Sequence, residues 1–439
     1  MTLRRRIGAR LELLRWVFFA EPAPPRAWTH ILPALATVLA ASSINATCQS
    51  AGWYERLEWV DLDRLQTSAM RRGPAANVTL VLITDREYED PALFRNTSPL
   101  DPDAIVRIVR AVCGFGPAIV GVDLLTSDWP PDGDRLASLG APCHVIWSQD
   151  VLEPESAERS NDDPPLMVLL PGKVLGREGA PAGGCAALPV LARDSDGVVR
   201  YYRARHPVRR ENAGIEYEPT LAWALAGGAN GHRCVGGANA EADTTPRKIR
   251  FTHNATITRV HARHVLEAVD EGAASLRQSL TSLLAGRTVI IGGAYRHGRD
   301  VHATSVGPLQ GAEVTANAVL TETDPIVSVD PWLSLAVDIA VGVVLLLVIV
   351  RLRLRWLWAL IASSLGAAAA AFVISWTLFN YTGYFLAVFG SLAGVVVGVL
   401  VDLWWEAAWR RWKEWRAEFE VRRAEISARV RRADVQEEN

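Results

Sequence analysis

The chain has almost no net charge and lacks the motifs that mark many enzymes. Its 46 Lys and Arg residues nearly balance 48 Asp and Glu residues, a composition that does not suit a general nucleic-acid binder. No G-x-S-x-G, H-E-x-x-H, G-x-G-x-x-G or P-loop lysine occurs, so the common hydrolase, zinc-protease and nucleotide-binding signatures are excluded. We therefore expect no enzymatic activity, no cofactor, no metal and no nucleic-acid partner.

The charges are nonetheless unevenly placed along the chain. Residues 1–26, 351–355 and 406–439 together carry 18 basic and 10 acidic residues, whereas the remainder carries 28 basic and 38 acidic residues. A membrane between the two parts explains this division, because cytoplasmic loops of membrane proteins are rich in Lys and Arg.

Four stretches are long and apolar enough to cross a bilayer as helices, which takes roughly 20 residues. They are residues 28–47, 332–350, 356–379 and 384–405. Four crossings place the three basic pieces on one side, in agreement with the positive-inside rule. We expect a multi-pass membrane protein in which residues 1–27 and 406–439 are cytoplasmic and residues 48–331 are extracytoplasmic. The first segment is expected to remain as an anchor, and cleavage as a signal peptide is the alternative.

The segment 48–331 has the pattern of an α/β domain. Strands are expected at residues 78–84, 118–125, 144–147, 166–170, 198–203, 248–251 and 288–292, and helices at residues 101–113, 134–139, 219–226, 275–284 and 311–320. Because strands alternate with helices, we expect a largely parallel or mixed sheet covered by helices. The fold class is therefore an α/β extracytoplasmic domain plus four transmembrane helices.

Four of the five cysteines lie well within this segment, at Cys113, Cys143, Cys185 and Cys234. An extracytoplasmic compartment permits disulfides, and four cysteines allow three pairings. Pairing Cys113 with Cys143 and Cys185 with Cys234 is preferred because it closes local loops. Buried free thiols are the alternative.

Six stretches of this segment follow one another in a recognisable order. They are VTLVLITDREYE at 78–89, IVRIVRAVCGFGPAIVGVDLL at 105–125, DGDRLASL at 132–139, RDSDGVVRYY at 193–202, EPTLAWALA at 218–226 and residues 284–322, which contain G-x-E-V-x-A-N. The series resembles the second class of CHASE domains, the cyclase/histidine-kinase-associated sensory extracellular domains. The resemblance covers roughly residues 28–405. It implies a sensor domain that one anchor precedes and three membrane helices follow, in an inner membrane of bacterial type.

The chain departs from the family pattern in three places. Residues 94–101 lack the usual Trp-Pro-aromatic-x-Arg run, and Thr304-Ser305 stands where Thr-Pro is common, so the family's ligand chemistry is not implied here. The short tail 406–439 cannot hold the cyclase or kinase domain that members often carry. The resemblance then implies a separate cytoplasmic effector, and analogy implies a homodimer.

Three aspartates, Asp85, Asp123 and Asp300, lie at or just beyond expected strands. In open α/β sheets, ligands bind at the carboxyl edge of the strands. If the three strands are parallel neighbours, we expect these carboxylates to converge on one rim and bind an extracytoplasmic ligand. The alternative is that each caps a helix or bonds to a loop.

A second acidic cluster, D-S-D-G-x-x-R over residues 194–200, is interpreted as a structural turn in which Gly197 takes a positive φ. Downstream, His261 and His264 have the spacing of one helix face. That spacing alone does not make a zinc site.

Asp338 lies inside the second expected span, and Asp402 lies near the inner end of the fourth. An ionisable group in lipid is costly unless it is paired. The alternatives for Asp338 are a helix-packing hydrogen bond and an element that moves on signalling. Asp402 can reach the interface.

The tail contains neither Pro nor Gly and is expected to continue the fourth span as a charged helix. An aromatic stripe runs along it at Trp409, Trp412, Trp415 and Phe419. The stripe either anchors the helix at the interface or docks the effector.

These features together favour a membrane-bound sensor that signals through its membrane helices to a separate effector. One alternative is a structural or assembly subunit of an envelope complex. Another is a membrane-anchored hydrolase, which would need a nucleophile or metal beside Asp85, Asp123 or Asp300.

Overall fold

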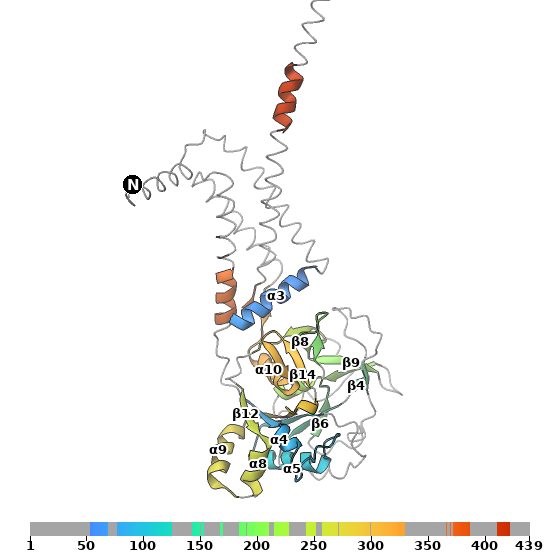
Figure 1. The fold of residues 1–439 in the computed structure, drawn as a ribbon, viewed down its shortest axis with the longest axis vertical. Coiled ribbons are helices and arrows are strands. Elements are labelled where there is room, and N and C mark those ends of the chain that lie inside the picture. The colour runs from blue at the N-terminus through green and yellow to red at the C-terminus, as the bar shows by residue number, and fades with distance from the viewer. Residues whose placement is uncertain are drawn as a thin grey trace, which may run out of the picture. The chain divides into compact units, whose positions relative to one another are not determined.

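The computed structural model divides the chain into two compact units (Figure 1). It describes residues 53–68, 77–124, 143–149, 151–152, 167–169, 184–189, 191–209, 215–227, 243–251, 257–270, 272–298, 300–329, 366, 369, 372–386 and 411–421. One unit, called the α/β unit below, comprises Asp63–Val327 and Phe379–Gly383. The other unit contains the remaining residues.

A six-stranded parallel sheet forms the centre of the α/β unit. Its strands lie in the order β12 (Thr258–His261), β1 (Val78–Ile83), β13 (Thr288–Gly293), β2 (Ile119–Asp123), β3 (Val145–Ser148) and β6 (Gly184–Ala187). Every neighbouring pair is parallel. The apolar runs of β1, β2 and β13 are buried on both faces, as expected for strands covered by helices on both sides.

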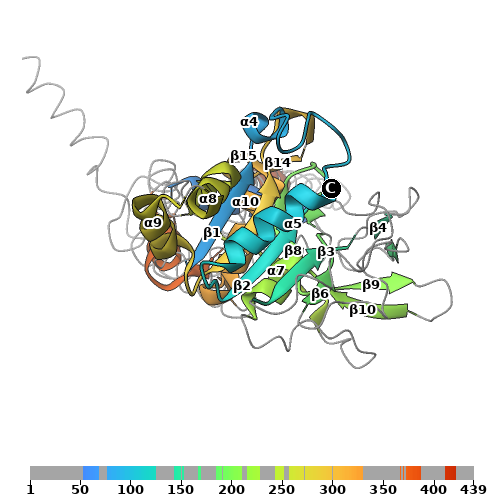
Figure 2. The ribbon, with the colours of Figure 1, turned by 90° about the horizontal axis from the view of Figure 1, so that it is seen from below.

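Helices cover the two faces of this sheet (Figure 2). On one face, α5 (Pro102–Cys113), α8 (Ala262–Asp270) and α9 (Ala274–Leu284) pack on alternate residues of the strands. On the other, α7 (Leu221–Ala226) and α10 (Gly311–Thr323) pack on the residues in between. Side chains of a strand alternate between faces, so each strand contributes to both cores. The first helix begins as its sequence indicates, because Asp101 accepts a hydrogen bond from the amide of Asp103.

Smaller sheets and helices complete the described structure. One sheet has the order β10 (Ile215–Pro219), β9 (Arg205–Arg209), β5 (Met167–Leu169), β4 (Val151–Leu152). Another contains β11 (Pro246–Lys248), β8 (Val199–Arg203), β14 (Val301–Thr304), β15 (Gly307–Gln310) and β7 (Ala192–Arg193), and a third pairs β16 (Val327–Ser328) with β17 (Tyr384–Phe385). The structure also contains α3 (Trp53–Ser68), α4 (Asp85–Tyr88) and the 3-10 turn η4 (Arg296–Gly298), and residues 372–382 and 411–421 are helical as well.

The α/β class is confirmed, with three refinements. The central sheet is parallel throughout, and antiparallel pairs occur only in the smaller sheets. The strand expected at 248–251 is wrong beyond Lys248, since β11 covers Pro246–Lys248. His261 ends β12 whereas His264 lies on α8, so the two histidines do not share one helix.

A disulfide joins Cys113, the last residue of α5, to Cys143, with their Cα atoms 5.5 Å apart. This is the first of the two pairings that the sequence favoured. The second involves Cys234, which lies outside the described residues.

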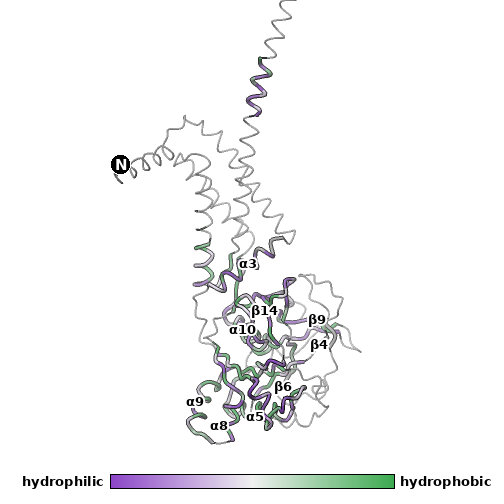
Figure 3. The backbone as a smooth tube through the Cα atoms, viewed as in Figure 1, coloured by the Kyte–Doolittle hydropathy of each residue, from purple (hydrophilic) through white to green (hydrophobic). Residues whose placement is uncertain are grey.

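The expected membrane segments lie mainly outside the described residues, as do Asp338, Asp402 and Trp409. Among the helices that are described, none is long and apolar enough to cross a bilayer. The four transmembrane helices therefore stay a prediction. The described part of the tail, residues 411–421, is helical and mostly hydrophilic along its length (Figure 3).

Candidate functional site

The carboxyl edge of the parallel sheet brings two of the three strand-end aspartates together. β13 lies between β1 and β2, and Leu82, Gly292 and Asp123 are aligned across the three strands. Asp300 lies close enough to Asp123 for the charge of its carboxylate to raise the pKa of Asp123. We call Asp123, Asp300, His302 and Thr315 the rim site.

Asp123 is the most perturbed group of the rim site. Its pKa is raised from 3.8 to about 7, chiefly by burial and then by the charge of Asp300. The hydroxyl of Thr315 on α10 donates a hydrogen bond to Asp123 Oδ2 over 2.9 Å, which lowers the pKa, as does nearby His302. This carboxyl therefore exchanges its proton near neutral pH, in a range where few side chains do so.

Asp300 directly precedes β14 and is held by His302 of that strand and by the start of α10. Its Oδ1 lies 2.9 Å from His302 Nε2, and Arg193 Nη2 lies 3.3 Å from the other ring nitrogen. A guanidinium can only donate, so when the His302 ring is neutral its Nδ1 accepts from Arg193 and its Nε2 carries the proton given to Asp300. The carboxylate also lies against Gly311, where any Cβ would collide with both of its oxygens.

Asp85 takes the local role that the alternative interpretation gave it. It begins α4 and accepts a hydrogen bond of 2.8 Å from the backbone amide of Arg296, whose Nε lies 3.4 Å from the other carboxylate oxygen. The ring of Tyr88 stacks on Tyr295 at 4.5 Å. Asp85 thus attaches the loop that follows β13 to α4, beside the rim site.

Asp194 and Asp196 belong to an ion cluster centred on the buried guanidinium of Arg200. The expected turn is present, with Gly197 at φ 83° and the Asp196 carboxylate bound to the amide of Val198. The guanidinium of Arg200, 4% exposed, contacts Asp194 at 2.8 Å and Asp196 at 2.9 Å. It also contacts Asp63 of α3 at 2.7 Å. The sequence indicated the turn but not the partner Asp63, because 137 residues separate it from Arg200.

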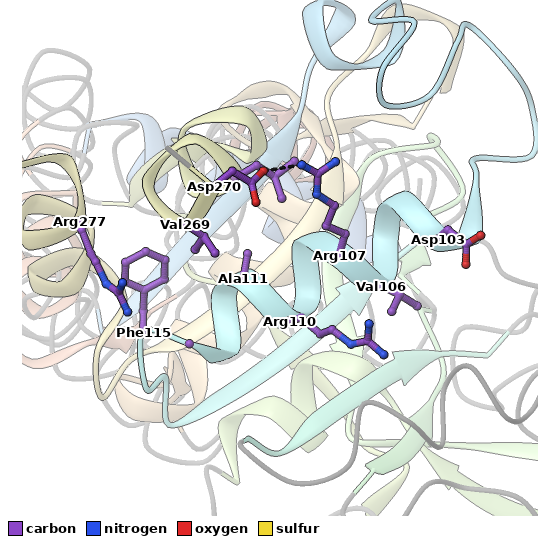
Figure 4. A pocket seen from close by; sticks show the side chains of 11 residues that line it. Asp103, Val106, Arg107, Arg110, Ala111, Phe115, Val269, Asp270 and Arg277 are labelled. Atoms are coloured by element: carbon purple, nitrogen blue, oxygen red, sulfur yellow. Dashed lines mark hydrogen bonds and ion pairs between the residues drawn. The ribbon is translucent and has the colours of Figure 1, made fainter. Parts of the chain in front are cut away.

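A groove of about 490 Å³ lies between α5, α8 and α9. Arg107 and Asp270 point toward one another across it and form an ion pair, and Arg277 and Phe115 also line it (Figure 4). The lining mixes apolar side chains with charges of both signs. Its volume is within the range of small-molecule sites, but its polar groups do not converge on one point.

A buried carboxylate that the sequence did not single out is that of Glu87. Its side chain is 1% exposed and accepts hydrogen bonds from the amide and hydroxyl of Thr84, which makes it part of the cap of α4. His261 Nδ1 lies 3.7 Å from its other oxygen. Within the described ranges, no three His, Cys, Asp or Glu side chains form a group able to hold a metal.

The described part of the tail exposes its aromatic stripe. Trp412, Trp415 and Phe419 are 42%, 61% and 52% exposed. Trp415 stacks on Phe419 at 5.6 Å, and the guanidinium of Arg416 lies 5.3 Å from the ring of Trp412. Three large aromatic side chains at this exposure form a surface suited to a partner or an interface.

The comparison with protein families matches residues 35–351 to the CHASE2 domain. This match spans most of the chain and includes the whole central sheet, the rim site and the Arg200 cluster. No curated protein and no solved structure matches.

Proposed function

The chain belongs to the CHASE2 domain family, and we propose that it is a membrane-bound extracytoplasmic sensor that signals to a separate cytoplasmic effector. CHASE2 domains are sensory extracellular domains, which supports the sensory role. The uneven charge and the four apolar stretches support an inner-membrane location with both termini in the cytoplasm.

The observation that carries the proposal is the position of α10. Near its start, Thr315 binds Asp123 of the rim site. At its end, Thr321 accepts from the backbone amide of Arg250, and Asp324 pairs with the Arg250 side chain at 2.6 Å. The chain then continues into the expected span 332–350. One helix therefore leads from the candidate ligand site toward the expected span 332–350.

A ligand at the rim site would act by favouring one position of α10. The Asp123–Thr315 bond and the hydrogen bond from the Gly311 amide to the Asp300 backbone carbonyl hold the start of this helix. A ligand that displaces either aspartate changes the balance between arrangements. Such signalling requires the ligand to bind the two arrangements with different affinities. Asp85 supports the site by fixing the neighbouring loop.

The output surface is the tail. We propose that Trp409, Trp412, Trp415 and Phe419 dock the effector, that Asp338 moves with the membrane helices, and that Asp402 lies at the inner interface. The exposure of Trp412, Trp415 and Phe419 supports docking. A homodimer would bring two such tails together, in keeping with the pairing common among membrane sensors.

The test is co-purification from native membranes. Tagged full-length chain is compared with a chain truncated after Trp405 and with the double variant Trp412→Ala, Trp415→Ala; the control is Glu414→Gln, Glu420→Gln on the same helix. An effector that binds the full chain and the control, but neither of the other two, supports the proposal. Identical recovered proteins from all four would contradict a role of the tail in output.

The groove between α5, α8 and α9 favours a second function, that of an assembly subunit binding another envelope protein. It offers exposed Val269, 43% exposed, among charges of both signs, as in the rims of many interfaces. Substituting Val269→Asp should then abolish cross-linking to an exterior partner and leave effector binding by the tail unchanged. A hydrolase is less well supported, since no serine or cysteine among the described residues is seen to bond with Asp123 or Asp300.

A further inference from the structure

Arg250 lies where three separate segments of the α/β unit meet. These segments are the end of α3, the stretch Asp324–Val327 after α10, and Phe379–Gly383. Each adjoins an expected membrane span in the sequence. Segment α3 follows the first span, Asp324–Val327 precedes the second, and Phe379–Gly383 connects the third and fourth.

The first segment holds the backbone on both sides of Arg250. Gln66 of α3 donates from Nε2 to the carbonyl of Ile249 over 2.9 Å and accepts from the amide of Phe251 over 3.3 Å. Gln66 is 4% exposed. Leaving a buried side-chain amide without these hydrogen bonds would cost stability. A movement of α3 is therefore expected to carry the segment Ile249–Phe251 with it.

The second segment is held by the Arg250 side chain. Nη1 lies 2.6 Å from Asp324 Oδ2, and Nη2 donates to the carbonyl of Pro325 over 3.3 Å. The two charged side chains are 9% and 18% exposed. Because water reaches this pair poorly, removal of one partner leaves a charge that is costly to keep buried.

The third segment packs on the same guanidinium from another direction. The Phe379 ring centroid lies 5.6 Å from Arg250 Cζ, a cation–π distance. Gly383 has φ +80°, and a Cβ there would lie 2.5 Å from Arg250 Nη2. The carbonyl of Gly383 also accepts from the amide of Val327 over 3.2 Å. Only glycine combines this backbone conformation with so close an approach.

We propose that Arg250 couples these three membrane-connecting segments, so that a shift in one is transmitted to the other two. The planar guanidinium is suited to this role, because it binds a carboxylate, a carbonyl and a ring face at once. A lysine keeps the charge but cannot keep this geometry. The proposal rests on the proposed function only in that it takes the adjoining spans to lie in a membrane.

Hydrogen exchange of the full chain in lipid nanodiscs tests the coupling. Arg250→Lys is expected to speed exchange about tenfold at residues 379–383 and 324–327, with β1 and β13 unchanged. Asp324→Asn, which alters only the second segment directly, should also speed exchange at 379–383. The matched control is Arg247→Lys, because Arg247 pairs with Glu322 of α10 at 2.6 Å and with Asp243.

The outcomes separate this proposal from the proposed function. Unchanged exchange at 379–383 in both Arg250→Lys and Asp324→Asn would overturn the coupling role, even if an effector is recovered with the tail. A response to Arg247→Lys equal to that of Arg250→Lys would also overturn it, because the effect would then be general. Loosening specific to Arg250 and Asp324 would support the coupling even if no effector is found.

Discussion

Thr315 on α10 donates a hydrogen bond of 2.9 Å to Asp123 at the end of β2. This contact ties the first turns of a helix to the edge of the central sheet. It also joins a carboxyl that titrates near pH 7 to the helix that leads toward the expected second span. A change of proton or ligand at one residue is thereby connected to the position of the other.

The pKa of Asp123 predicts how stability depends on pH. The value is about 7 in the folded protein against an ordinary 3.8, so the folded state binds more protons between these values. The free energy of unfolding should therefore fall as the pH rises from about 4 to about 7. Asp123→Asn should remove that dependence and be more stable than the wild type at pH 8, by about 1–3 kcal/mol.

Thermal unfolding of the full chain between pH 4 and pH 8 measures the pH dependence and the stability difference. Asp85→Asn at the same edge is the control, and a wild-type slope in Asp123→Asn would contradict the assignment.

Gly311 predicts a steric test of the rim site. Gly311→Ala places a methyl group against the Asp300 carboxylate and should cost about 1–3 kcal/mol of unfolding free energy. Asp300→Ala in the same chain should recover much of that loss, since it removes the colliding atoms. A double-mutant cycle by denaturant unfolding measures the interaction. Simple additivity of the two changes would show that the carboxylate is not the obstacle.

The Arg200 cluster predicts that α3 depends on one buried cation. Arg200→Met leaves three carboxylates without their shared partner and should destabilise the protein by about 3 kcal/mol or more. Asp63→Asn should cost less, because Asp63 is 30% exposed. The control is Arg107→Met, whose pair with Asp270 is 54% and 44% exposed and should contribute at most about 1 kcal/mol. Urea unfolding monitored by tryptophan fluorescence compares the three, and equal losses would contradict the special role of Arg200.

The disulfide predicts on which side of the membrane the domain lies. Cys113–Cys143 should be intact in protein from native membranes, because an extracytoplasmic compartment is oxidising. Reduction should destabilise the domain by about 2–4 kcal/mol. Maleimide labelling without and with reductant, compared with Cys113→Ser, measures the bond. Free thiols at both positions in native membranes would contradict an extracytoplasmic location.

Local patterns of the sequence were enough to predict most of the central fold. The apolar runs of β1, β2 and β13 and the amphipathic face of α5 depend on neighbours in the chain, and the structure has them within a residue or two of the expected bounds. β12 and α8 were missed, since the short strand Thr258–His261 alternates too little to be distinguished from a loop. The candidate site was predicted in part. Asp123 and Asp300 meet at the carboxyl edge of neighbouring parallel strands, whereas His302, Thr315 and Gly311 could not be assigned before the chain was folded.

The α/β class and the family of the chain could be predicted from the sequence alone, as could the positions of Asp85 and Asp123 at or just beyond the ends of β1 and β2. These follow from periodicity and motifs, which act over a few residues. The folded structure was needed to show that Asp63 meets Arg200 and that Gln66, Asp324 and Phe379 gather around Arg250. The residues that make these contacts lie far apart in the chain. The residues next to an arginine in the sequence do not show whether its side chain faces solvent or a buried carboxylate. The cost of burying a charge without a partner selects among such contacts, and it acts only after the chain has folded.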